Sequence, residues 1–205
     1  MLNPMANLSF FVSSTTCYVS LLMSDHHYRE RLLLDGRTQA SVLIPFIQSV
    51  WNKAGAPLLS QINVPKGPGS FTSLRVTLAA AQGLSLAFPN ATCYAPTFFD
   101  VLLYDHPVNS YAVIDSKRGD FFVKRQKSEP VILTADAFTE FQMMHHDRYM
   151  IVDPDLIDSF PNAVSYDPIV LLDALSAAAT FILPSDFSPY YLVEPAYKKT
   201  KESSA

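Results

Sequence analysis

Cysteine is scarce in this chain, and no hydrophobic run is long enough to cross a membrane. The two cysteines, Cys17 and Cys93, are too few for a disulfide framework, and their separation matches no zinc-binding pattern. Both lie in apolar, strand-like surroundings, which predicts buried, reduced thiols. The longest apolar stretch, residues 169–183, is interrupted by Asp173 and is shorter than a bilayer span. Since residues 1–11 also lack the basic region of a signal peptide, we expect a cytoplasmic protein without a membrane anchor.

Charged residues are also few. They make up 17% of the 205 residues, whereas hydrophobic residues make up 49%, which is typical of a folded globular protein. Fifteen Lys and Arg against nineteen Asp and Glu give a net charge of -4. A protein that binds nucleic acid by itself draws on a basic surface, so we expect any RNA to be held by a partner. This length allows one core or two small lobes.

Hydrophobic periodicity and turn residues divide the chain into two parts. The first part predicts three strands, a helix, a strand and two more helices, at residues 8–12, 16–23, 27–34, 38–54, 62–64, 70–88 and 97–104. After a polar break at 105–109, the second part predicts strands at 110–115, 121–125, 131–133 and 149–152, a helix capped by Thr134, and a last helix at 167–183. This order predicts two related α/β lobes, at residues 1–108 and 109–205.

Glycine is rare, and two of the six glycines fall in one tripeptide. Gly67, Pro68 and Gly69 predict a tight turn, and Ser70 is placed to cap the following helix by accepting a backbone N–H. Free N–H groups in such a turn would suit an anion. However, no Lys-Ser or Lys-Thr pair follows the last glycine, as it does in a P-loop. We interpret the turn as a structural connection from strand to helix, with an anion site as the alternative.

The helix that follows this turn has one charged residue, Arg75, between Ser70 and Phe88. At 100° per residue, small side chains gather on one face and large apolar ones on the opposite face. The small face is Thr72, Val76, Ala80, Gly83 and Ala87, and the large face is Phe71, Leu74, Leu78 and Leu86, with Arg75 and Gln82 among them. Because no face is charged, we expect the helix to be covered all round. We predict that the small face packs inside the subunit and the large face contacts another subunit; the alternative is a central helix buried within one chain.

Three segments resemble the TsaB (YeaZ) family. Residues 67–83, GPGSFTSLRVTLAAAQG, are similar to the family signature Gly-Pro-Gly-Ser-Phe-Thr-Gly-(Leu/Val)-Arg and its small-residue helix. Residues 112–120, AVIDSKRGD, resemble the family's Ile-Asp-Ala-Arg-(Arg/Met)-Gly-Glu, and residues 189–192, PYYL, resemble its terminal Pro-x-Tyr-Leu-Arg. With the leading strands and the first helix, the resemblance covers most of the chain in order.

The resemblance implies an α/β fold of the actin and Hsp70 type, with two ribonuclease-H-like lobes of mixed sheet plus helices. It implies a non-catalytic scaffold subunit without a cofactor or metal, which pairs with the related catalytic subunit TsaD in forming threonylcarbamoyladenosine in tRNA. A TsaE-like ATPase joins through the complex, tRNA is contacted only indirectly, and the isolated subunit is a homodimer. The resemblance implies that helices 41–54 and 70–87 form the interface with TsaD or with a second copy. The candidate contact residues are Ile47, Trp51, Phe71, Leu74, Arg75, Leu78 and Gln82.

The chain departs from the family pattern where relatives of this fold hold nucleotide. Phe11 stands where the first strand usually has Asp, which removes a carboxylate that would hold Mg²⁺ and phosphates. Ser73 replaces a glycine, Lys117 stands where Arg is common, and Val193 replaces the terminal Arg. Gln39 lies nearest to the position of a family histidine. These changes argue against nucleotide binding and leave the scaffold interpretation intact.

Two other functional classes stay open: an active ATP-dependent or glycoprotease-like enzyme of the same superfamily, and an unrelated homodimeric adaptor. TsaD-like enzymes bind metal through His-x-x-x-His, but the pairs at 26–27 and 145–146 have no partner four residues away. Adjacent side chains diverge, so we interpret both pairs as solvated surface. Asp115 belongs first to a turn whose charges meet solvent. Identification of partners would separate the adaptor from the scaffold.

Overall fold

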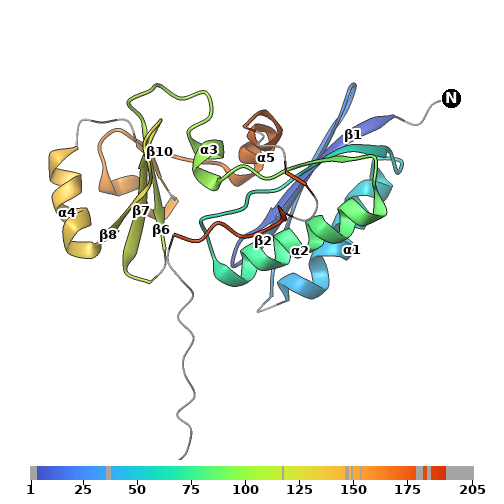
Figure 1. Ribbon diagram of the computed structural model, residues 1–205, viewed down its shortest axis with the longest axis horizontal. Coiled ribbons are helices and arrows are strands. Elements are labelled where there is room, and N and C mark those ends of the chain that lie inside the picture. The colour runs from blue at the N-terminus through green and yellow to red at the C-terminus, as the bar shows by residue number, and fades with distance from the viewer. Residues whose placement is uncertain are drawn as a thin grey trace, which may run out of the picture.

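A computed structural model of the chain describes residues 4–35, 38–116, 118–145, 148, 150–152, 154–178, 182–183 and 186–192. Within these residues the chain forms two five-stranded mixed sheets (Figure 1). The sheets stand at opposite ends of the molecule, and helices α3 and α5 lie between them. No helix in the described part of the chain is long and apolar enough to cross a membrane.

The first sheet has the strand order β3-β2-β1-β4-β5. Its strands are β1 (Met5–Val12), β2 (Thr16–Met23), β3 (His27–Leu33), β4 (Leu58–Asn63) and β5 (Thr92–Tyr94). The first three form an antiparallel meander, and β4 and β5 run parallel to β1. The predicted strands are confirmed, except that β5 was not predicted because its three residues carry too short a pattern.

Two helices connect the strands of the first sheet and cover one of its faces. They are α1 (Gln39–Lys53) and α2 (Phe71–Ala87), both close to their predicted bounds. Along β1, the alternate residues Ala6, Leu8, Phe10 and Val12 point to these helices and form a buried cluster with residues of α1 and α2. Cys17 and Cys93 lie buried in this cluster as free thiols, as predicted, and burial raises the pKa of Cys17 to about 11.

The second sheet repeats the topology of the first, with the order β10-β9-β6-β7-β8. Its strands are β6 (Tyr111–Asp115), β7 (Asp120–Arg125), β8 (Val131–Thr134), β9 (Met150–Val152) and β10 (Ala163–Ser165). Helix α4 (Ala135–Met144) begins after Thr134, whose hydroxyl accepts the N–H of Ala137, as predicted. A 3-10 helix (Pro154–Ser159) and β10 were not predicted. The matching strand orders confirm two related α/β units.

Helix α5 (Pro168–Ala177) returns to the first sheet although it follows the second in the sequence. It packs against β1, β2 and β3 on the face opposite to α1 and α2, and against α3 (Phe98–Leu102). A buried cluster between the two sheets therefore combines Phe11 of β1 with Leu172 of α5 and Ile114 of β6. The lobe boundary between residues 108 and 109 stays a prediction.

Asp100 fastens α3 to the second sheet. Its carboxylate accepts the N–H and the hydroxyl of Thr97 at 3.1 and 2.6 Å, and the ammonium of Lys124 on β7 at 3.0 Å. Burial alone would raise the pKa of Asp100, but the bonds from Thr97 and the charge of Lys124 outweigh it and hold the pKa below its usual value. The charged form of Asp100 is therefore stabilised in the folded protein.

We expect Asp100→Asn to lower stability near pH 7 by about 0.2–1 kcal/mol, because the carboxylate is partly exposed and its attraction to Lys124 is screened. A depressed carboxyl pKa contributes stability above the unfolded value of about 3.9, and this contribution disappears as the pH falls through the folded pKa. Thermal unfolding from pH 3 to pH 7 should therefore show a difference in Tm that shrinks in acid. Asp105→Asn is the control; a difference that persists at pH 3 would assign the effect to packing.

Candidate functional site

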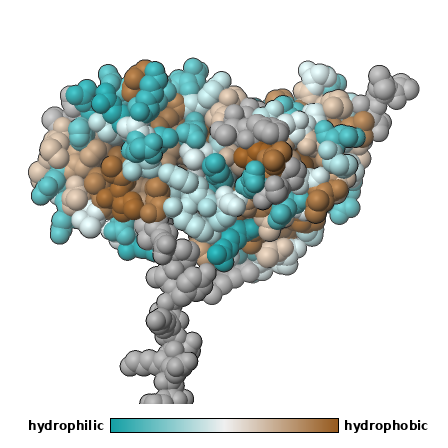
Figure 2. Space-filling view, in the orientation of Figure 1, coloured by the Kyte–Doolittle hydropathy of each residue, from teal (hydrophilic) through white to brown (hydrophobic). Residues whose placement is uncertain are grey.

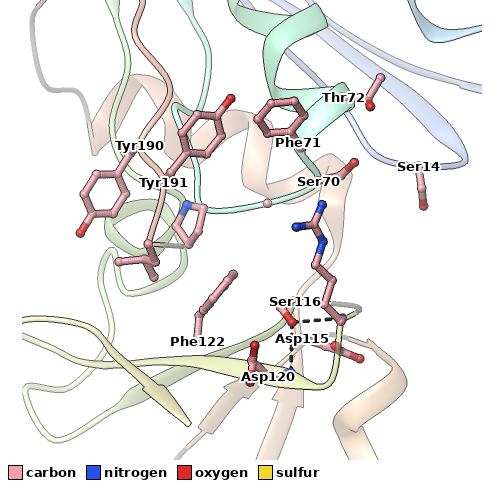
Figure 3. A pocket seen from close by; sticks show the side chains of 14 residues that line it. Ser14, Ser70, Phe71, Thr72, Asp115, Ser116, Asp120, Phe122, Tyr190 and Tyr191 are labelled. Atoms are coloured by element: carbon pink, nitrogen blue, oxygen red, sulfur yellow. Dashed lines mark hydrogen bonds between the residues drawn. The ribbon is translucent and has the colours of Figure 1, made fainter. Parts of the chain in front are cut away.

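A cleft of about 340 Å³ lies between the two sheets (Figure 3). Its walls are the β1–β2 turn, the turn at residues 67–70 (the signature turn) with the start of α2, the β6–β7 hairpin, and residues 190–192 of the C-terminal segment. The lining residues are Ser14; Pro68, Gly69, Ser70, Phe71 and Thr72; Asp115, Ser116, Arg118, Asp120 and Phe122; and Tyr190, Tyr191 and Leu192. All three segments that carry the family resemblance therefore meet at one place.

The hairpin side of the cleft is held by Ser116. Its hydroxyl accepts the backbone N–H groups of Arg118 at 3.1 Å and Asp120 at 3.2 Å. The predicted hairpin between residues 110–115 and 121–125 is confirmed by antiparallel pairing of β6 with β7. Asp115 is half-buried and lies in the cleft wall, so it is less exposed than a residue at the tip of a surface turn. Lys117 and Val193 lie outside the described residues.

Phe11 fills the position that the resemblance gives to a carboxylate. It is buried, its ring stacks on Tyr18 at 4.8 Å, and it meets Phe98 edge-on at 6.0 Å. It also belongs to the buried cluster between the sheets. At this point β1 therefore supplies an aromatic ring to the buried cluster between the sheets, where the family pattern has a carboxylate.

Two other departures from the family pattern have structural roles. Gln39 is buried, and its amide donates to the carbonyl of Ser14 at 3.3 Å. Ser73 is also buried, and its hydroxyl donates to the hydroxyl of Ser70 at 3.3 Å. Ser70 is the N-cap residue of α2 as predicted, but its side chain accepts no helix N–H, so that part of the prediction is wrong.

The signature turn requires glycine at its first position. Gly67 has φ +114°, in the region that favours glycine, and it precedes a cis bond to Pro68. A Cβ at Gly67 would lie 2.5 Å from the carbonyl oxygen of Tyr190 and 3.0 Å from a methyl group of Leu74. At Gly69 a Cβ would meet nothing within 4 Å. Gly67 therefore has no room for a side chain, whereas Gly69 in the same tripeptide does.

We expect Gly67→Ala to destabilise the subunit by about 1–3 kcal/mol, through its backbone conformation and the blocked approach of Tyr190. Gly69→Ala, two residues away, has open space and should change stability little. Urea unfolding of both variants checks this. Equal stability of the two variants would contradict the assigned contact between Gly67 and Tyr190.

The predicted division of α2 into an inward small face and an outward large face is wrong, because residues of both faces lie on its exposed side. Leu74 and Leu78 of the large face are buried against the first sheet, Leu78 with only 2% exposed, and Ile47 of α1 is buried beside them. Thr77 connects α2 to β1, because its hydroxyl accepts the N–H of Val12 at 3.2 Å and donates to the carbonyl of Ser73 at 2.9 Å. Within the subunit these leucines and Ile47 are core, so they do not form an exposed contact face.

The outward face of α2 is formed by exposed residues of mixed size. They are Thr72, Arg75, Ala79, Gln82, Gly83, Leu86 and Ala87. Leu86 is 77% exposed, and a Cβ at Gly83 would meet nothing within 4 Å. Of the residues predicted as contacts, Arg75 and Gln82 lie on this face. Phe71 is half-buried at its edge, under the guanidinium of Arg75.

An apolar groove of about 170 Å³ runs between α1 and α2 beside this face. Trp51 lines it, with its indole N–H donating to the carbonyl of Pro57 at 2.8 Å and its ring edge-on to Phe88 at 5.8 Å. The other lining residues are Leu8, Ile44, Ile47, Gln48, Leu59 and Leu84. In the view of Figure 2, hydrophobic side chains reach the surface where α2 ends, and again over the β7–β8 side of the second sheet.

His27 is not the solvated residue that we predicted. Its Nε2 lies 2.8 Å from the hydroxyl of Ser20 and 3.1 Å from the carboxylate of Asp173 on α5, and Arg29 binds the same carboxylate. Burial lowers the pKa of His27 below its ordinary value. The negative charge of Asp173 raises the pKa in part, and the positive charge of Arg29 lowers it further. In a Ser-His-Asp triad the acid takes the other ring nitrogen, so this cluster instead ties α5 to the sheet.

Of the other paired histidines, one is exposed and one packs among aromatic rings. His26 is exposed beside Asp25, as predicted, whereas His145 packs among the rings of Tyr111 and Phe141. His146 lies outside the described residues. Over the described part of the chain, no group of three His, Cys, Asp or Glu side chains is placed to hold a metal ion.

Comparison with known proteins finds the same resemblance. Residues 36–92, which include α1, β4 and α2, match the family model described as TsaD, tRNA N6-adenosine threonylcarbamoyltransferase. A protein of Buchnera aphidicola subsp. Baizongia pistaciae, named tRNA threonylcarbamoyladenosine biosynthesis protein TsaB, is 36% identical over 83 residues. The resemblance to the TsaB (YeaZ) family is confirmed. The match covers 38% of this chain and 36% of the TsaB relative.

Solved structures named after YeaZ share the fold over nearly the whole chain. YeaZ from Pseudomonas aeruginosa is 17% identical, with a TM-score of 0.64, covering 93% of this chain and 100% of that one. A second structure, a protein with similarity to peptidase YeaZ from Pseudomonas aeruginosa, is 18% identical, with a TM-score of 0.66 over 94% and 100% of the two chains. The predicted actin-like, ribonuclease-H-like α/β fold of the TsaB family is therefore confirmed.

Proposed function

We propose that this chain is a non-catalytic scaffold subunit of the TsaB type, which pairs with a TsaD-like subunit in forming threonylcarbamoyladenosine in tRNA. The observation that carries the proposal is the surface of α1 and α2, where a helix face without carboxylates adjoins an apolar groove. The signature at residues 67–83, the relative named TsaB and the YeaZ-like fold support the same assignment.

The partner surface comprises the outward face of α2 and the groove between α1 and α2. Gly83 and Ala79 are small and exposed, so the backbone of a partner helix can approach α2 closely there. Ile44, 43% exposed, and the half-buried Trp51 offer apolar area next to it. Apolar side chains gathered in a groove are typical of a contact surface. Arg75 and Gln82 give this surface its polar contacts.

One surface serves both assemblies in this proposal. When alone, the subunit pairs with a second copy through α1 and α2, and the TsaD-like subunit replaces that copy. A TsaE-like ATPase then joins through the complex. The net charge of -4 favours an arrangement in which the partner holds the tRNA, because phosphate binding draws on a basic surface.

The assignment as non-catalytic rests on Phe11, which lines a second cavity next to the cleft. Phe11 occupies with an aromatic ring the place where an acidic residue would hold a metal and phosphates. The alternative, an active ATP-dependent or glycoprotease-like enzyme, requires a catalytic group in the cleft, and Asp115 is the candidate because it lies in the wall.

We expect the purified chain alone to hydrolyse no ATP and to cleave no peptide, with or without Mg²⁺ or Zn²⁺, because it lacks the first-strand carboxylate. Phosphate release and peptide cleavage assays check this. Metal-dependent turnover that is lost in Asp115→Asn would favour the enzyme and contradict the scaffold.

We expect Gly83→Leu to keep the Tm of the free subunit while removing binding to the TsaD-like subunit of the same organism and self-association together. The added side chain meets open space in the monomer and separates α2 from a partner helix. Leu78→Ala should do the reverse and cost about 2–5 kcal/mol of subunit stability, because it empties a core position. Thermal unfolding measures the Tm, titration calorimetry measures binding to the TsaD-like subunit, and sedimentation measures self-association.

Gly83→Ala is the matched control, since one methyl group keeps the face small. It should raise stability by roughly 0.5–1 kcal/mol and retain binding. Normal binding by Gly83→Leu would place the partner surface elsewhere. Absence of binding by the unmutated chain, and its failure to restore the tRNA modification in a strain lacking TsaB, would overturn the proposed function.

A further inference from the structure

The C-terminal segment 189–192 lies against the signature turn, although the two are more than a hundred positions apart in the sequence. The N–H of Tyr190 donates to the carbonyl of Lys66 at 2.6 Å. The carbonyl oxygen of Tyr190 occupies the space that a Cβ at Gly67 would need. The absence of a side chain at Gly67 is therefore what admits this segment, which gives the glycine a role other than anion binding.

The next residue of the segment holds the first turn of α2. The ring of Tyr191 stacks on Phe71 at 5.3 Å with an interplanar angle of 25° (Figure 3). Its hydroxyl accepts the Nε–H of Arg75 at 3.0 Å, and the Arg75 guanidinium lies 3.8 Å from the centre of the Phe71 ring. Tyr191 thus contacts two residues that are one turn apart on the helix.

These contacts matter because the start of α2 lacks the local features that stabilise a helix N-terminus. The N-cap Ser70 makes no side-chain bond to a helix N–H, and the first turn has no acidic residue. Helix ends fray readily, so tertiary contacts with the side chains of the first turn stabilise it. Leu192 packs against the buried cluster between the sheets, so the segment is anchored at the second lobe's side as well.

We propose that residues 189–192 are a latch that positions the partner surface. Seated on the Gly67–Ser70 turn, the latch fixes the first turn of α2 and with it Phe71 and Arg75, which border the outward face. This inference rests on the proposed function, and it identifies Tyr191 as a positioning residue that acts on the partner through α2.

Hydrogen exchange of the free subunit and partner binding together test the latch. In Tyr191→Ala, amides of residues 74–76, the first hydrogen-bonded ones of α2, should exchange about tenfold faster, the factor expected for losing one hydrogen bond to a charged group, while residues 81–85 keep their protection. Affinity for the TsaD-like subunit should fall about tenfold. Tyr191→Phe, which keeps the stacking on Phe71, should show smaller changes of both. Tyr104→Ala, an exposed tyrosine elsewhere, should show neither.

The outcomes separate the latch from the proposed function. Unchanged exchange in Tyr191→Ala would overturn the latch, and so would faster exchange with normal affinity, because binding would then not depend on the position of the first turn. Faster exchange spread evenly over α2 would show general destabilisation and would also overturn it. If the unmutated chain does not bind the TsaD-like subunit, the proposed function fails, and the latch as a positioning element for that partner fails with it.

Discussion

The packing of α2 on β1 is the contact on which most of the architecture depends. Thr77 joins the helix to the N–H of Val12, and Leu74 and Leu78 fill the core below it. With this side buried, the opposite side of α2, with Ala79 and Gly83, is directed outward. The same packing brings the signature turn to the edge of the interlobe cleft, so the orientation of one helix sets both the proposed partner surface and a wall of the cleft.

The second constraint is the aromatic contact at Phe11. In folds of this topology two similar units face each other across a cleft, and the first strand of each unit ends there. Phe11 packs against Tyr18 and Phe98 of its own lobe, and it belongs to the buried cluster that also contains Ile114 and Phe122 of the second sheet. A carboxylate at this position would be expensive to bury without a cation or other partner. The chain thus gains contact between lobes where related enzymes keep a site for a charged ligand.

The cleft, the latch and the helix pair form one connected region. The latch residues Tyr190 and Tyr191 are cleft wall on one side and contacts of the α2 start on the other. A scaffold needs a surface that is held in one conformation before its partner arrives, because ordering a flexible surface during binding costs affinity. Residues 189–192 supply that order for α2, because its N-cap residue makes no side-chain hydrogen bond to a helix N–H.

The elements that depend on local pattern could be predicted from the sequence. Strand 16–23, the helix after the Gly67–Ser70 turn and the cap at Thr134 follow from periodicity and short-range bonding, and the motif at 67–83 led to the family. The side of α2 that is buried could not be predicted, because a helix with one charged residue has no clear polar face. Its buried side depends on how the helix packs against the sheet. Likewise, no local signal joins Gly67 to Tyr190 or Asp173 to His27. Contacts between distant segments depend on how the two sheets are placed, and that placement is a property of the whole core.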